Sequence, residues 1–166
     1  MTDKELQENW NELLNIYKGI LFNNCDFYNG INDKLTYDFA CPQYAILKEK
    51  YKLKDIAKQG SELEKAIRLL SFFAPQITHK GDFQNNIGCN AIDYCLDKPE
   101  KGINCLNKSK ILQECCLALG IYARRIWLMP YSPFDTENHV VIEIYDFSLK
   151  KWVMLDMTSN GYFVNA

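Results

Sequence analysis

Apolar residues recur at every third or fourth position through the first half of the chain, which is the spacing of helices that bury one face. Residues 4–21 show this spacing most clearly and predict an amphipathic helix that covers the core. Its apolar face is made by Leu6, Trp10, Leu13, Leu14 and Tyr17. A turn-rich stretch follows over 23–34, and the pattern of residues 42–60 predicts one or two short helices that end at Gly60.

The next helix has the clearest boundaries in the sequence. Ser61 and Glu64 have the spacing of a capping box, in which each side chain bonds the other residue's backbone, and Pro75 marks the end of the helix. Residues 76–90 are polar and rich in Gly and Asn, so they predict a loop. A short helix is expected behind it, over 90–98.

Past Pro99 the pattern changes from helical spacing to short runs typical of strands. One more helix is predicted over 104–120, with Asn104 as its N-cap and Gly120 just past its end. Three runs rich in Val, Ile, Trp and Tyr then predict strands over 122–130, 139–147 and 151–157. Helices first and antiparallel strands second indicate an α+β fold.

Length and charge narrow the class of protein. A chain of 166 residues with 48% hydrophobic composition fits one globular domain over 1–166, with a helical part over 1–60 and a core over about 61–166. The formal net charge is -2 and the basic residues are spread along the chain, which argues against nucleic acid or a membrane surface as a partner. The first twenty residues are too charged for a signal peptide, and no apolar run approaches the ~20 residues that span a bilayer. We therefore expect a soluble, cytoplasmic protein.

Seven cysteines, an odd number without a repeating spacing, argue against a disulfide framework and favour reduced thiols. They stand at positions 25, 41, 89, 95, 105, 115 and 116. Paired Cys-x-x-Cys spacings of the kind that hold zinc are absent, and the sequence has two histidines, His79 and His139. We expect no metal and no cofactor.

One of these cysteines stands where chemistry is plausible. Cys115 and Cys116 fall in the middle of the predicted helix, where a free cysteine behaves as a small buried hydrophobe. Cys105 instead falls in the first turn, after Asn104, where free backbone N–H groups and the positive end of the helix dipole favour a thiolate. The same N–H groups could bind the oxyanion of an acyl-transfer intermediate. The alternative is a capped helix with an incidental cysteine.

A thiol nucleophile needs a base and a group that orients the base, and the hairpin that follows offers both. A four-residue loop over Asp146–Leu149 would pair Tyr145 with Lys150, and the same register sets His139 directly opposite Asp156 on one face. Burial of a lone carboxylate is costly, which favours a partner for Asp156. The alternative is an ordinary strand-end Asp in a turn.

Together these residues form a pattern that resembles the transglutaminase-like superfamily of papain-like thiol enzymes. It consists of "GINC" at 102–105, the interval of 15 residues from Cys105 to Gly120, "LGIYARRIW" at 119–127, "NHVVIEIY" at 138–145 and "KKWVMLDMT" at 150–158. The resemblance covers about residues 60–160. It implies a papain-like α+β fold and a triad made of nucleophile Cys105, base His139 and orienting Asp156.

The implied activity is acyl transfer from a peptide or protein amide through an acyl-cysteine. Water as the second substrate makes a peptidase or amidase, and an amine makes a transglutaminase. The alternative is a catalytically silent binding module that keeps the fold. Three positions depart from the superfamily's pattern: Tyr122 and Met157 stand where proline is usual, and Val141 where tryptophan is common. The chain also ends ten residues after Asp156, where relatives tend to continue, so a shortened C-terminus is expected.

Four further groups are read as structural. His79 is expected to be an ordinary loop histidine, because nothing near it in the sequence supplies a nucleophile. Glu143 shares the face of His139 and is expected to pair with Arg124 or Arg125. The two tryptophans Trp127 and Trp152 are expected in the core.

Overall fold

The computed structural model describes residues 37–80, 102–130 and 138–163, together with positions 11, 12, 15, 92 and 95. Contacts divide the chain into two units, one formed by residues 1–36 with 129–137 and the other by 37–128 with 138–166. The account below concerns the second unit, and the single-domain organisation stays a prediction. Outside the described residues, apart from those five positions, lie the predicted helices over 4–21 and 90–98, the turn-rich stretch 23–34 and most of the predicted loop over 76–90.

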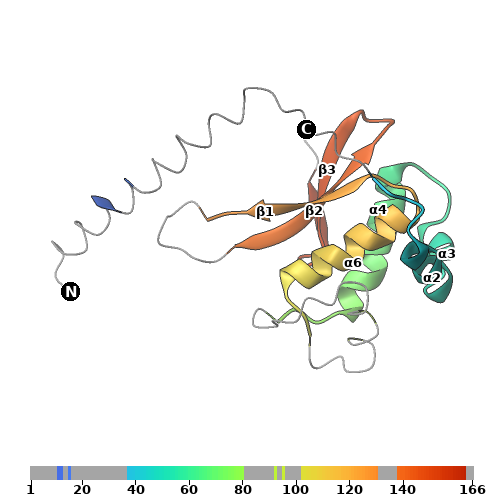
Figure 1. Ribbon diagram of the computed structural model, residues 1–166, viewed down its shortest axis with the longest axis horizontal. Coiled ribbons are helices and arrows are strands. Elements are labelled where there is room, and N and C mark those ends of the chain that lie inside the picture. The colour runs from blue at the N-terminus through green and yellow to red at the C-terminus, as the bar shows by residue number, and fades with distance from the viewer. Residues whose placement is uncertain are drawn as a thin grey trace. The chain divides into compact units, whose positions relative to one another are not determined.

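Helices precede an antiparallel sheet in the second unit, so the predicted α+β order is confirmed. Its four strands lie in the order β1-β2-β3-β4, and helices α4 and α6 both pack on the sheet (Figure 1). The helices are α2 (Pro42–Lys50), α3 (Leu53–Ala57), α4 (Glu62–Phe73) and α6 (Cys105–Ala118), with a 3₁₀ turn over Ala74–Gln76. The strands are β1 (Ala123–Leu128), β2 (His139–Asp146), β3 (Lys151–Asp156) and β4 (Gly161–Phe163). β4 was not predicted, because three residues are too few to show an alternating pattern.

The predicted capping box begins α4. The Glu64 N–H donates to Ser61 Oγ over 3.3 Å, and the Ser61 N–H donates to Glu64 Oε2 over 3.1 Å. Two of the four N–H groups that a helix start leaves unpaired are satisfied in this way. The helix then gives way to the 3₁₀ turn that contains Pro75, as the sequence predicted.

Both ends of α6 are also as predicted. Asn104 is the N-cap, and its side-chain oxygen accepts the Asn107 N–H over 3.1 Å. At the other end Gly120 has φ +78°, a left-handed conformation that favours glycine. The Gly120 N–H donates to the Leu117 carbonyl and the Ile121 N–H to the Cys116 carbonyl, which is the Schellman arrangement. Cys105 is therefore the first residue of a helix with well-defined ends.

The register of the β2–β3 hairpin differs from the prediction. Tyr145 pairs with Trp152 and Asp146 pairs with Lys151, so the predicted pairing of Tyr145 with Lys150 was wrong. The loop does hold four residues, but they are 147–150. Lys150 closes the turn in the left-handed conformation, with φ +53°.

Asp146 is the residue of β2 by which the strand pairing extends beyond the predicted end at Tyr145. Its fully buried carboxylate accepts the Leu149 N–H over 2.9 Å and the Leu63 N–H of α4 over 2.9 Å. Burial by itself raises the pKa of Asp146, but these bonds and one from the Ser148 hydroxyl outweigh it and lower the pKa to about 2. One carboxylate therefore joins the hairpin to the start of α4.

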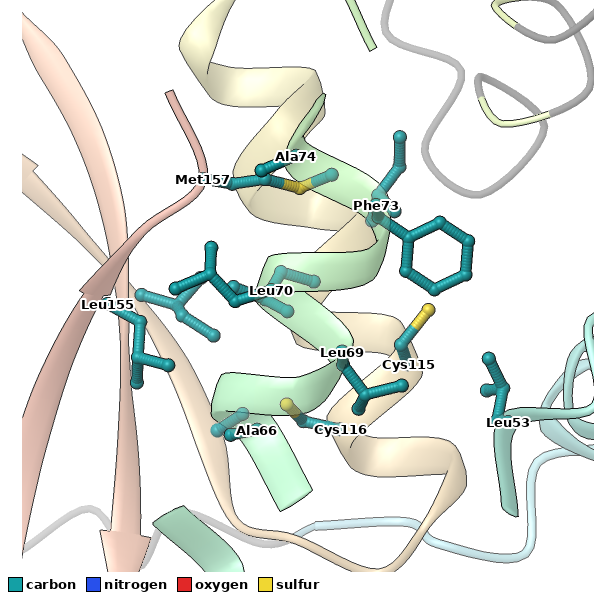
Figure 2. Close-up of a cluster of buried hydrophobic side chains, with 14 of the residues drawn as sticks. Leu53, Ala66, Leu69, Leu70, Phe73, Ala74, Cys115, Cys116, Leu155 and Met157 are labelled. Carbon is teal, nitrogen blue, oxygen red and sulfur yellow. The ribbon is translucent and has the colours of Figure 1, made fainter. Parts of the chain in front are cut away.

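The core lies between α4, α6 and the sheet. Figure 2 shows Leu69, Leu70 and Phe73 of α4 together with Cys115 and Cys116 of α6. Both cysteines are fully buried, so the prediction that they serve packing is confirmed. The described cysteines, Cys41, Cys95, Cys105, Cys115 and Cys116, are all free thiols.

The two tryptophans, both predicted to lie in the core, are not fully buried. Trp127 is 50% exposed near the end of β1, so that prediction was wrong for it. Trp152 is partly buried and stacks under the Arg124 guanidinium, 4.2 Å from the ring centroid. Within the described part of the chain, no helix is long and apolar enough to cross a membrane.

Candidate active site

A hydrogen bond joins His139 to Asp156 at one end of the sheet. Nε2 of His139, the first residue of β2, lies 3.0 Å from Oδ2 of Asp156, the last residue of β3. The predicted contact between His139 and Asp156 is therefore present. The prediction that the two residues lie directly opposite each other was wrong. Continuing the observed register sets Val141 opposite Asp156 and makes His139 the diagonal neighbour. Diagonal neighbours share a face, and a long or aromatic side chain can span the gap between them.

Asp156 is held as a carboxylate. Its Oδ1 accepts the Thr158 N–H over 2.7 Å, and its Oδ2 accepts the Ser159 hydroxyl over 2.8 Å in addition to His139. Burial raises the pKa of Asp156, but the hydrogen bonds from Thr158, His139 and Ser159 outweigh it and lower the pKa below its usual value. An ionised carboxylate is an acceptor only, so the shared proton belongs to His139 Nε2 and Nδ1 is the nitrogen left to accept a proton.

Cys105, the predicted nucleophile of the candidate site, is the first residue of α6. Its side chain is partly exposed, in contrast with the buried Cys115 and Cys116 of the same helix. The Asn107 N–H donates to the side-chain oxygen of Asn104. The N–H groups of Cys105 and Leu106 have no partner inside the helix. A partly exposed thiol thus lies at a helix start, where the N–H groups of the first turn have no partner within the helix itself.

A buried hydrogen bond fastens α6 to the start of β2. The Ser109 hydroxyl, one turn past Cys105, donates to the carbonyl of Val140, the residue after His139, over 2.5 Å. This contact ties the helix that carries the cysteine to the strand that begins with the histidine. The pairing of Cys105 with His139 as nucleophile and base stays a prediction.

Lys108 is a buried charged residue of α6 that sequence analysis did not single out. It lies three residues after Cys105 on α6, and its side chain is 2% exposed. Burial lowers the pKa of its ammonium, while the negative charges of Asp156 and Cys95 raise it, and the net shift is downward.

His79, which was expected to be an ordinary loop histidine, lies outside the named strands and its backbone contacts the segment before Cys105. A parallel bridge pairs it with Ile103, two residues before Cys105. The Ile103 N–H donates to the Thr78 carbonyl over 3.0 Å, and the Lys80 N–H donates to the Ile103 carbonyl over 2.9 Å. The residues around position 79 do not predict this bridge, because it joins segments that are 24 positions apart.

Gly102 allows the two segments to approach. It has φ +60°, and a Cβ at this position would lie 2.9 Å from the Thr78 carbonyl oxygen. Any other residue would clash with that backbone and would also be strained. The glycine of "GINC" therefore lets the segment that carries His79 lie against the residues that lead into Cys105.

The predicted structural pair on the face of His139 is confirmed. Arg124 Nη2 lies 2.7 Å from Glu143 Oε2, and Arg124 Nε donates to the same oxygen over 2.8 Å. Arg124 is thus the partner of Glu143, and its guanidinium also lies over Trp152. Among the described residues, no group of three or more His, Cys, Asp or Glu side chains is arranged to hold a metal ion.

Comparisons with known proteins support the fold. A protein from Cytophaga hutchinsonii described as a "Putative Cysteine Protease" aligns with a TM-score of 0.55 and 18% identity, over 76% of this chain and 43% of that one. A structure described as a "TGase" aligns with a TM-score of 0.48 and 17% identity, over 82% of this chain and 37% of that one. This chain therefore spans less than half the length of either. No family model matches the sequence, and no curated protein matches it.

At this level of identity the likeness concerns the fold. The first of these two alignments confirms the expected papain-like α+β fold.

Proposed function

We propose that the chain is a cysteine-dependent enzyme that breaks an amide bond through an acyl-cysteine, with Cys105 as nucleophile, His139 as base and Asp156 as the orienting group. The observation that carries the proposal is the 3.0 Å hydrogen bond between His139 and Asp156 on the strands beside a helix that begins with Cys105. The fold that this chain shares with a protein described as a cysteine protease supports it. The substrate is a peptide or protein amide.

The first half of the reaction follows from the site residues. Nδ1 of His139 accepts the thiol proton, and the Cys105 sulfur attacks the carbonyl carbon of the amide. The tetrahedral oxyanion accepts hydrogen bonds from N–H groups at the start of α6. The C–N bond then breaks as the imidazolium returns its proton to the leaving amine, which yields a thioester on Cys105.

The second half decides between two products. Water that loses a proton to His139 attacks the thioester and releases a carboxylic acid, as in a peptidase or amidase. A primary amine does the same and forms a new amide, as in a transglutaminase. In both cases Asp156 holds the ring orientation and stabilises the imidazolium. We place the enzyme in the cytoplasm, where the free thiols at the described cysteines would persist.

The test is a peptide library incubated with the protein in the presence and absence of a labelled primary amine. Cleavage without the amine identifies a hydrolase, and incorporation of the label identifies a transglutaminase. Cys105→Ala should abolish both activities, and Cys41→Ala should abolish neither. An active Cys105→Ala protein would contradict the proposal, and a wild-type protein that binds peptides without turning them over would identify a binding module.

A further inference from the structure

A cavity of about 590 Å³ lies where residues 51–58 pack on helix α4. Among the described residues, its lining comes from the junction of α2 and α3, from α3, from the residue after α3 and from the second half of α4. This volume lies within the range of ligand-binding sites. The described lining includes no residue of α6 or of the sheet, so the cavity is distinct from the candidate active site.

Part of the lining is an apolar wall that the core holds in place. Tyr51, Ile56 and Phe72 contribute to it, and Phe72 is 46% exposed. The rings of Tyr51 and Phe72 both pack edge-to-face against the buried ring of Phe73, with centroids 6.2 and 5.0 Å away. These contacts fix the two aromatic rings before any partner binds, which lowers the entropy cost of binding.

Positive charge surrounds the apolar wall. The described lining holds three cations, Lys52, Lys58 and Arg68, and one carboxylate, Asp55. Both lysine side chains are exposed, so their ammonium groups are accessible. The excess of positive charge at the cavity contrasts with the net charge of -2 on the whole chain. Charge complementarity therefore favours an anionic partner at this cavity.

The two lysines have backbone conformations that side chains rarely adopt. Lys52 has φ +49° and ψ +46°, and Lys58 has φ +56° and ψ -162°. The second combination lies close to a region that essentially glycine alone adopts. Such strain costs stability, and residues that carry it cluster at binding and active sites. A lysine in a position better suited to glycine indicates that its side chain has a role at the cavity.

Arg68 holds the strained residue in place. Its Nη1 donates to the carbonyl of Ala57 over 2.7 Å and to the carbonyl of Gln59 over 2.8 Å, on either side of Lys58. The Lys58 N–H donates to the Lys54 carbonyl over 2.9 Å. These three hydrogen bonds determine the backbone at Lys58, so Arg68 is a positioning residue for this part of the cavity.

We propose that the cavity is a docking site for an acidic peptide segment of a partner protein. An apolar side chain of the segment packs on Tyr51, Ile56 and Phe72. Carboxylates on either side of it pair with the ammonium groups of Lys52 and Lys58. An inorganic anion would use the lysines but not the apolar wall, whereas an acidic peptide uses both. The proposal does not depend on the proposed function, because no catalytic residue takes part in it.

The test is fluorescence anisotropy with an array of labelled peptides, each with one apolar residue between two pairs of glutamates. At least one member should bind, and its binding should weaken between about 50 and 500 mM salt. Replacing its apolar residue by alanine, or its glutamates by lysines, should weaken binding by about 10-fold or more. An array in which no peptide binds, or in which the lysine peptides bind equally well, would overturn the proposal.

Variants locate the binding on the protein. Lys52→Gln and Lys58→Gln should each weaken binding by about 2- to 5-fold, and Phe72→Ala by about 10-fold. Lys54→Gln, which removes an exposed lysine of α3 outside the described lining, is the matched control and should bind as the wild type does. Equal losses in Lys54→Gln and Lys58→Gln would reduce the effect to net charge and overturn the site.

Lys58→Gly distinguishes a binding role from a structural one. Glycine adopts the backbone conformation of Lys58 without strain, so the Tm should rise by about 2–4 °C while peptide binding weakens. Lys58→Arg keeps the charge and should bind as the wild type does. A Lys58→Gly protein that binds the peptide as tightly as the wild type would overturn the role of this lysine.

Two further measurements separate the proposal from its alternatives. Sedimentation with phosphatidylserine vesicles tests an anionic membrane surface, and binding to vesicles without binding to any peptide would overturn the proposal. Cys105→Ala should bind the peptide as the wild type does, so docking and catalysis fail independently. A protein that turns over amides but binds no acidic peptide keeps the proposed function and loses this inference.

Discussion

Nε2 of His139 donates to Oδ2 of Asp156 across a strand pair in which the two residues are diagonal neighbours. This relationship leaves Nδ1 as the only ring nitrogen able to accept a proton. Among the described residues, His139, Thr158 and Ser159 each donate a hydrogen bond to Asp156, so its orientation is fixed by its own turn as well as by the histidine.

Replacing Asp156 should slow catalysis while the Cys105 thiol remains accessible to reagents. In Asp156→Asn the amide can still contact the ring, but it no longer stabilises the imidazolium and it favours the wrong tautomer. We expect kcat/KM to fall by about 10²–10⁴-fold while alkylation of Cys105 remains possible. Steady-state kinetics and mass spectrometry of the alkylated protein measure the two effects. A variant with wild-type kcat/KM would remove Asp156 from the mechanism.

Removing the Ser109 hydroxyl should loosen α6 at the start of β2. Ser109→Ala leaves the buried Val140 carbonyl without its 2.5 Å hydrogen bond, which costs about 1–3 kcal/mol in the free energy of unfolding. Chemical denaturation measures this loss. We also expect kcat/KM to fall, because the helix that carries Cys105 is no longer fastened beside His139. Ser71→Ala, an exposed position on α4, is the matched control and should cost little.

Cys115 should matter for stability alone. It is fully buried against α4, so Cys115→Ala leaves a small cavity and costs about 1–3 kcal/mol in the free energy of unfolding. Differential scanning calorimetry should show a lower Tm with an unchanged kcat for the folded protein. Loss of turnover in folded Cys115→Ala would instead assign chemistry to this thiol.

Asp146 should make stability depend on pH in the acid range. Its pKa is lowered to about 2 from 3.8, so the carboxylate stabilises the folded state fully above pH 3.8 and less as pH falls toward 2. Asp146→Asn should lose about 1–2 kcal/mol of unfolding free energy at neutral pH and show a flatter dependence between those pH values. Urea denaturation across pH 2–6 measures both effects.

Exposed Asp55 on α3 provides the control for this titration. Asp55→Asn should keep the wild-type pH dependence. An Asp146→Asn protein that also keeps it would contradict the structural role of the buried carboxylate.

The features that sequence analysis predicted correctly depend on local chemistry. The Ser61–Glu64 capping box, the Asn104 cap and the left-handed Gly120 each involve residues within a few positions of one another. The parity of the β2–β3 pairing was also predicted correctly, because any loop of four residues pairs positions whose numbers sum to an odd value. This parity is sufficient to set His139 and Asp156 on one face.

What the sequence did not predict depends on contacts between distant segments. The hairpin loop begins one residue later than predicted, after Asp146, which bonds Leu63 from 83 positions away. The backbone of His79 lies beside the segment that leads into Cys105 because of its bridge to Ile103, and Lys108 was recognised only once its burial was known. A hydrophobic pattern predicts neither the bridge of His79 nor the burial of Lys108. The interval of three residues from Cys105 to Lys108, however, can be seen in the sequence.

Cysteine reactivity measured thiol by thiol tests the central claim most directly. Cys41 and Cys105 are both partly exposed free thiols at helix starts, Cys41 as the N-cap of α2 and Cys105 as the first residue of α6. Alkylation by iodoacetamide at neutral pH, followed by peptide mass spectrometry, should label Cys105 well before Cys41, and His139→Ala should slow Cys105 alone. Equal rates at the two thiols, with no effect of His139→Ala, would contradict Cys105 as a nucleophile activated by His139.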